Sequence, residues 1–134
     1  MISSGAEQIS NTMVMNVLLI DDDAISNFIN SRVLSRLGIV KELNTALNGK
    51  EALDQINKRG LPDVIFVDLN MPVMDGFQFI EAFARLDRSK TVKVKVIIVT
   101  SSESPQDIQR AKSLGVENYL VKPMKDADIL RIFN

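Results

Sequence analysis

Three acidic side chains stand directly after apolar runs of this chain. Asp21 and Asp22 follow the apolar residues 17–20, and Asp68 follows the apolar residues 64–67. Apolar runs of this length, bounded by turn residues, are typical of fully buried parallel strands. The carboxyl ends of neighbouring strands meet at one edge of a doubly wound sheet, so the three carboxylates are expected to lie together.

A cluster of three carboxylates needs a compensating group. Two unit charges about 4 Å apart repel by roughly 4 kcal/mol at an effective dielectric near 20. The cluster therefore requires a nearby cation or a raised carboxyl pKa, and hard oxygen ligands with room for water suit Mg²⁺. A simpler interpretation treats these acids as turn and helix-capping residues. It accounts for Asp23 as the N-cap of the next helix, but it does not account for Asp22.

A hydroxyl and a cation end two later apolar segments. Thr100 closes the apolar run 96–99, and Lys122 follows the segment 118–121. Alone, the threonine is explained by its preference for strands, and the lysine by solvation at the surface. At the same sheet edge as Asp68, the two side chains would stabilise negative charge beside that carboxylate, as phosphoryl transfer requires.

Strands and helices alternate along the chain and would position these side chains. We expect strands at residues 16–20, 42–46, 63–68, 92–100 and 118–121, and helices at 24–37, 50–58, 76–86, 105–114 and from 126 to the end. This alternation predicts one α/β domain, a doubly wound five-stranded parallel sheet of order 2-1-3-4-5 with both faces covered. Residues 1–15 are polar and weakly patterned, which predicts a flexible N-terminal tail before a domain of residues 16–134.

The composition excludes several classes of protein. The 134 residues are 46% hydrophobic and 25% charged, as in ordinary globular domains. The absence of His and Cys excludes Ser–His and Cys–His catalysis, His metal ligands and a histidine phosphocarrier. A net charge of −1 argues against a nucleic-acid partner, and no apolar run is long enough to span a membrane. The first basic residue is Arg32, which does not match a signal peptide, so we expect a cytoplasmic protein.

Four short motifs, taken together, resemble the receiver domain of two-component response regulators. They are LLIDD at 18–22, VDLNMPVMDG at 67–76, IIVTS at 97–101 and YLVKP at 119–123. The resemblance runs from about residue 16 to the end. It implies a flavodoxin-like (βα)₅ fold and an aspartyl phosphate formed with Mg²⁺. The donor would be a histidine kinase or a histidine phosphotransfer protein, and the domain would catalyse only its own phosphorylation and dephosphorylation.

The resemblance also implies roles for the acidic residues. Asp68 would be the phosphoacceptor. Asp22 and Asp68 would bind Mg²⁺ directly, together with the backbone carbonyl of Asn70. Asp21 would act on the metal through a bound water.

Four further residues match positions of the family pattern. Thr100 and Lys122 would hold the phosphoryl oxygens. Tyr119 matches an aromatic side chain whose rotamer follows Thr100, and this pair would change the domain's surface for a downstream partner. The bond from Lys122 to Pro123 is expected to be cis, and proline is the usual site of cis peptide bonds.

The first expected helix carries more apolar residues than one buried stripe needs. Ile29, Val33 and Leu37 are spaced four residues apart and would face the sheet. Ile25 and Phe28 would then form an exposed apolar platform beside the acids, where a partner's histidine approaches Asp68. The family uses this helix to bind kinases and phosphotransfer domains. The alternative is that Phe28 packs beneath the connection to the second strand.

Three other interpretations fit these residues less well. A haloacid-dehalogenase-like phosphohydrolase shares the Asp-x-Asp pattern of residues 21–23, but Ile25 departs from its motif and no acidic pair follows Lys122. A degenerate receiver that is never phosphorylated does not fit the intact acids, and a dinucleotide-binding fold needs a glycine-rich turn after the first strand. No output domain is expected on this chain. Its output could therefore be a diffusible messenger, a phosphorelay intermediate or a sink for phosphate.

Overall fold

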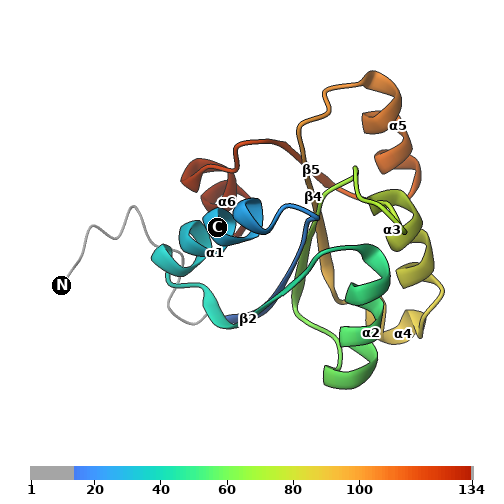
Figure 1. Cartoon of the computed structure of the whole chain (residues 1–134), viewed down its shortest axis with the longest axis horizontal. Coiled ribbons are helices and arrows are strands. Elements are labelled where there is room, and N and C mark those ends of the chain that lie inside the picture. The colour runs from blue at the N-terminus through green and yellow to red at the C-terminus, as the bar shows by residue number, and fades with distance from the viewer. Residues whose placement is uncertain (1–13, 134) are drawn as a thin grey trace.

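The computed structural model describes residues 14–133 as a five-stranded sheet with helices on both faces (Figure 1). The strands are β1 (Met15–Ile20), β2 (Val40–Ala46), β3 (Val64–Val67), β4 (Lys95–Thr100) and β5 (Asn118–Val121). The helices are α1 (Ala24–Arg36), α2 (Gly49–Arg59), α3 (Gly76–Ala84), α4 (Arg88–Thr91), α5 (Pro105–Ser113) and α6 (Asp126–Phe133). Most of the expected N-terminal tail lies outside the described residues. The strand β1 begins at Met15, which that expectation had placed in the tail.

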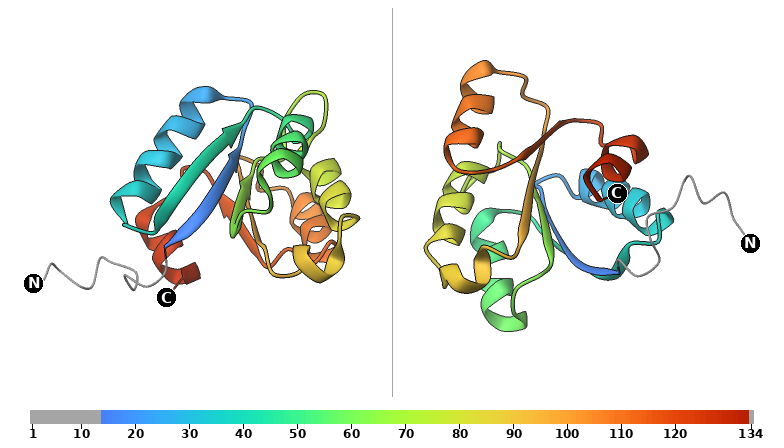
Figure 2. Two further views of the ribbon diagram at one scale, coloured as in Figure 1. Left: turned by 90° about the horizontal axis from the view of Figure 1, so that it is seen from below. Right: turned by 180° about the vertical axis from the view of Figure 1, so that it is seen from behind.

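All strand pairs are parallel, and the order is β2-β1-β3-β4-β5. The predicted doubly wound fold is therefore confirmed. Helices α1 and α6 cover one face of the sheet, and α2, α3 and α5 cover the other (Figures 1 and 2). Each face has its own apolar core, with Leu34 and Ile129 buried on the first and Phe79 on the second. Within residues 14–133, no helix combines the length and the apolarity needed to span a membrane.

The start of β4 differs from the prediction. The expected strand began at residue 92, but the chain first forms the one-turn helix α4, and β4 begins at Lys95. Asp87 caps α4 by accepting hydrogen bonds from the backbone N–H and the hydroxyl of Ser89. Thr91 is buried beneath this turn, and Val92 is 70% exposed. The predicted start at residue 92 did not take this local cap into account.

The rotation of α1 also differs from the prediction. Ile29 was expected to face the sheet, but it is 52% exposed. The buried residues within α1 are Asn27, Val33 and Leu34. At 100° per residue, a stripe centred on Leu34 places Ile29 about 140° away around the helix. The four-residue spacing of apolar side chains therefore identified the wrong face in the first turns of α1.

Candidate functional site

The acidic cluster forms where β1 and β3 end side by side. Ile20 and Val67 are partners in the parallel ladder, and the Asp68 N–H donates a 2.9 Å hydrogen bond to the Ile20 carbonyl. One carboxylate oxygen from each of Asp21, Asp22 and Asp68 lies within 4.8 Å of the others. Asp21 and Asp68 are buried, and Asp22 is exposed. The structure thus brings the three predicted acids together at the rim of the sheet.

Lys122 reaches this cluster from the end of β5. Its Nζ donates a 2.7 Å hydrogen bond to Oδ2 of Asp21 and lies 3.5 Å from Oδ2 of Asp68. The Lys122 N–H donates to the Thr100 carbonyl at 2.8 Å, which extends the pairing of β4 with β5. The bond from Lys122 to Pro123 is cis. The ammonium group therefore neutralises part of the charge that the buried carboxylates bring together.

Burial raises the pKa of Asp68 above its ordinary value. The Lys122 ammonium opposes this rise, and the charge of Asp21 adds to it. The Leu69 N–H and the Thr100 hydroxyl also favour the ionised carboxyl without cancelling the effect of burial. For Lys122, burial disfavours the charged form, but the bond to Asp21 and the nearby charges outweigh it, so the lysine pKa is raised. The rise at Asp68 thus follows from burial and from the neighbouring acid, and the rise at Lys122 follows from its pairing with two acids.

Thr100 and Tyr119 are linked through Ser102, a residue that sequence reasoning missed. Thr100 is fully buried, and its Oγ1 accepts a 3.2 Å hydrogen bond from the Ser102 N–H. The Tyr119 hydroxyl donates to the Ser102 carbonyl at 2.9 Å. The Ser102 hydroxyl donates to Asp107 at 2.6 Å, close to the start of α5. Ser102 therefore connects Thr100 to Tyr119 and to the start of α5 by hydrogen bonds.

The loop after β3 is fixed by one glycine. The Gly76 N–H donates a 2.9 Å hydrogen bond to the Leu69 carbonyl. A Cβ at Gly76 would lie 2.3 Å from the Asp68 carbonyl oxygen, so no larger residue fits without moving the backbone of the site. Asn70, whose carbonyl was predicted to bind metal, is exposed in this loop. Its role as a ligand stays a prediction.

The start of α1 presents an apolar surface beside the acids. Ile25, Phe28 and Ile29 are 69%, 60% and 52% exposed, and the Arg32 guanidinium lies 5.8 Å from the centre of the Phe28 ring. Asp23 caps the helix by accepting a 2.9 Å hydrogen bond from the Ile25 N–H. Phe28 does not pack beneath the connection to β2, so this alternative is wrong.

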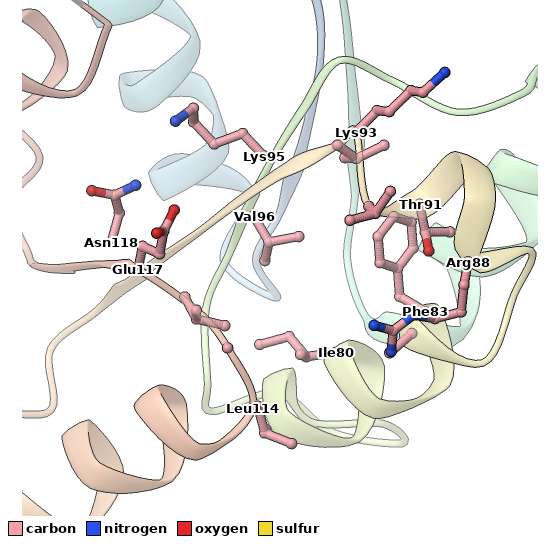
Figure 3. Close-up of a pocket in the computed structure, with 15 residues that line it drawn as sticks. Ile80, Phe83, Arg88, Thr91, Lys93, Lys95, Val96, Leu114, Glu117 and Asn118 are labelled. Atoms are coloured by element: carbon pink, nitrogen blue, oxygen red, sulfur yellow. The ribbon is translucent and has the colours of Figure 1, made fainter.

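One hollow on the described part of the chain lies away from the acids. Its volume is about 370 Å³, and it opens at the amino ends of β4 and β5, where Ile80 and Phe83 of α3 form part of its wall (Figure 3). Arg88 of α4 and Glu117 also line it. None of the three clustered acids contributes to this hollow. The candidate site is therefore the acidic rim at the opposite ends of the strands.

Comparison with known proteins identifies the family. The response regulator receiver domain family matches residues 17–134. The chain belongs to this family. The chemotaxis response regulator CheY4 of Vibrio cholerae is 33% identical, with a TM-score of 0.75 over 89% of this chain and 95% of that one. A two-component response regulator from Cytophaga hutchinsonii is 30% identical, with a TM-score of 0.82 over 89% and 93% of the two chains.

Curated relatives differ greatly in length. The probable methanogenesis regulatory protein FilR2 of Methanothrix harundinacea is 31% identical over 120 residues, which cover 86% of this chain and 76% of that protein. Hybrid signal transduction histidine kinase B of Dictyostelium discoideum is also 31% identical, but the match covers 87% of this chain and only 6% of the kinase. The receiver domain is thus a module that occurs both in small regulators and in large kinases. Acceptance of a phosphoryl group is general to this family, and receiver domains generally bind Mg²⁺.

Proposed function

We propose that Asp68 accepts a phosphoryl group from a phosphohistidine of a histidine kinase or a histidine phosphotransfer protein. The observation that carries this proposal is the placement of Asp68, buried at the end of β3 with the Lys122 ammonium 3.5 Å away. An Asp68 oxygen forms the new P–O bond as the P–N bond to the imidazole breaks. The imidazole nitrogen leaves with the electron pair of that bond and takes a proton from solvent. The sequence contains no His, so the donor imidazole lies outside it.

The acidic cluster fits a Mg²⁺ ion. Its donors are oxygens from Asp21, Asp22 and Asp68 within 4.8 Å of one another, and hard oxygen donors suit this metal. Asp22, Asp68 and the Asn70 carbonyl would bind the ion directly, and Asp21 would act through a metal-bound water. Bound Mg²⁺ supplies positive charge that offsets the oxygens of the transferring phosphoryl group. The domain catalyses only its own phosphorylation and dephosphorylation, without acting as a conventional enzyme.

Thr100 and Lys122 hold the phosphoryl oxygens after transfer. Lys122 already contacts Asp68, and the buried Thr100 hydroxyl favours the ionised form of Asp68. Movement of Thr100 towards the phosphoryl group is transmitted through Ser102 to Tyr119. A ligand shifts such an equilibrium only by its differential affinity for the two conformations. The surface formed by α5, β5 and α6 would then bind a downstream protein.

Ile25 and Phe28 form the docking platform for the phosphodonor. Both are exposed at the start of α1, in the helix that follows Asp21 and Asp22. A few side chains at the centre of an interface, often aromatic ones, carry most of the binding free energy. We place this exchange in the cytoplasm, where the proposed kinase partners would act.

The first experiment tests the acceptor. Incubation with a small phosphodonor and MgCl₂, followed by borohydride trapping and mass spectrometry, is expected to place the label on Asp68. The Asp68→Asn variant should remain unlabelled, while Asp63→Asn, which removes an acid at the amino end of the same strand, should label normally. Label on Asp21 or Asp23 would contradict the proposal and favour the phosphohydrolase interpretation.

The second experiment tests the docking platform. The double variant Ile25→Ala with Phe28→Ala is expected to slow transfer from a phosphorylated histidine phosphotransfer protein and to leave labelling by a small phosphodonor unchanged. Val92→Ala, which also truncates an exposed apolar side chain, is the matched control and should transfer normally. A loss of stability of about 3–5 kcal/mol, as for a buried Phe, would contradict the surface role.

A further inference from the structure

Asn27 is buried where apolar neighbours are exposed. The residue lies on α1 and is 4% exposed, whereas Ile25 and Phe28 on the same helix are 69% and 60% exposed. Burying an amide costs free energy unless its polar atoms form hydrogen bonds. The first turns of α1 thus place an amide inside and large apolar groups outside, so the amide must make specific contacts.

The Asn27 amide joins three segments at the edge of the acidic site. Its Nδ2 donates to the Asp21 carbonyl at 3.0 Å and to the Ala46 carbonyl at 3.4 Å. The Asp21 N–H donates to the same Ala46 carbonyl at 3.0 Å. Asp21 is the first residue after β1, and Ala46 is the last residue of β2. The amide therefore holds the ends of two strands against the helix that follows Asp22.

These contacts act on the backbone that carries two of the clustered acids. The carboxylate of Asp21 is held separately, by Lys122 at 2.7 Å and by the Asp23 N–H at 2.9 Å. Its carbonyl lies beyond the last paired residue of β1 and is held by Asn27. Since Asp22 follows directly, a shift of this peptide would move both side chains relative to Asp68.

The amide oxygen of Asn27 also lies beside the acidic site. Asn27 Oδ1 is buried and has no hydrogen-bond partner within residues 14–133. Asn27 lines a small hollow of about 10 Å³ together with Asp21 and Asp68. An amide supplies donors to the backbone here without adding negative charge to a cluster that already holds three acids. An apolar residue would leave the Asp21 carbonyl unpaired, and an acid would repel it.

We propose that Asn27 is a positioning residue of the phosphorylation site, which sets the spacing of Asp21 and Asp22 relative to Asp68. The inference rests on the proposed function, because the affected property is the affinity of these acids for Mg²⁺. Some residues orient metal ligands through hydrogen bonds without touching the metal. Replacing such a residue typically weakens metal binding 10-fold to 100-fold. Asn27 acts through the backbone and does not touch the phosphoryl group.

Gln55 offers a matched control. It lies on α2, its Nε2 donates to the Thr45 carbonyl of β2 at 2.7 Å, and its Oε1 is also buried without a partner in the described chain. Asn27→Ala and Gln55→Ala each remove a helix amide from a β2 carbonyl. Only Asn27 also holds Asp21. If Asn27 had a purely structural role, the Mg²⁺ affinity would be the same in both variants.

The test measures Mg²⁺ affinity directly, by NMR titration of each variant with MgCl₂, and stability by urea unfolding in EDTA. We expect the Mg²⁺ dissociation constant to rise about 10-fold in Asn27→Ala and to stay at the wild-type value in Gln55→Ala. Labelling of Asn27→Ala by a small phosphodonor should be slow at low Mg²⁺ and recover at saturating Mg²⁺. If Asn27→Ala does not fold, Asn27→Leu keeps the buried volume and replaces it in the same titration.

Each outcome decides the inference. Equal Mg²⁺ affinity in the Asn27 and Gln55 variants would overturn the positioning role of Asn27. Failure of both Asn27 variants to fold would also overturn it, because Asn27 would then be needed for folding alone. Failure of the proposed function has a different signature. In that case the wild-type protein itself would neither bind Mg²⁺ nor carry label on Asp68.

Discussion

Lys122 is the cation between two buried carboxylates, and its removal gives the sharpest electrostatic test of the site. At an effective dielectric near 20, its attraction to Asp21 at 2.7 Å amounts to about 6 kcal/mol, and that to Asp68 at 3.5 Å to about 5 kcal/mol. The measured loss is smaller, because the cost of burying the ammonium disappears with it. Breaking a buried ion pair typically costs about 3–5 kcal/mol. The Lys122 side chain is 26% exposed, so we expect Lys122→Met to lose about 3 kcal/mol at pH 7 in EDTA.

The assay is urea unfolding followed by far-ultraviolet circular dichroism, since the chain has no Trp and a single Tyr. The loss should shrink as the pH falls, because protonated carboxyls no longer repel each other. It should also shrink on addition of MgCl₂, whose cation would occupy the same acidic cluster. Adding Asp21→Asn to Lys122→Met should recover part of the lost stability, because one of the two repelling charges is then gone.

The control is a surface ion pair of nearly the same length. Arg36 lies 2.6 Å from Asp126, but these side chains are 60% and 46% exposed. Exposed pairs contribute about 0–1 kcal/mol, because solvent and salt screen them. Arg36→Met should therefore cost less than about 1 kcal/mol. Equal losses in Arg36→Met and Lys122→Met, or no loss in the latter, would refute the electrostatic account of the site.

Two further predictions concern Asp68 and its loop. Burial raises the pKa of Asp68 in the folded state above its value in the unfolded chain. At neutral pH the ionised Asp68 carboxylate therefore destabilises the folded state, and this effect disappears below the ordinary carboxyl pKa, where the group is protonated in both states. Asp68→Asn should therefore raise the free energy of unfolding at pH 7 in EDTA, and urea titrations should show this gain vanish in acid. Gly76→Ala should destabilise the domain by about 1–3 kcal/mol, because its Cβ would lie 2.3 Å from the Asp68 carbonyl and 2.8 Å from the Leu69 Cα. A Gly76→Ala variant with wild-type stability and wild-type Mg²⁺ affinity would show that the loop adapts freely.

The sequence by itself determined the fold and the location of the chemistry. Apolar runs that stop at Asp21 and Asp68 identify β1 and β3, because only strands covered on both faces are apolar at every position. The signals that start helices are equally local: Asp23 is the N-cap of α1 as predicted, and Asn48 and Ser104 cap α2 and α5 in the same way. Since parallel strands place their carboxyl ends at one edge, strand order was enough to predict that the acids meet.

Only the tertiary structure decided which faces and contacts complete the site. Helical spacing predicted that Ile29 is buried, but burial depends on which surface lies opposite, and Asn27 takes the inner position through its bonds to two strand ends. The contact between Lys122 and Asp21 joins residues 101 positions apart, and its 2.7 Å geometry depends on β3 and β4, which lie between β1 and β5 in the sheet. Periodicity and capping act within a few residues, whereas helix rotation and ion pairing are set by groups far apart in the chain.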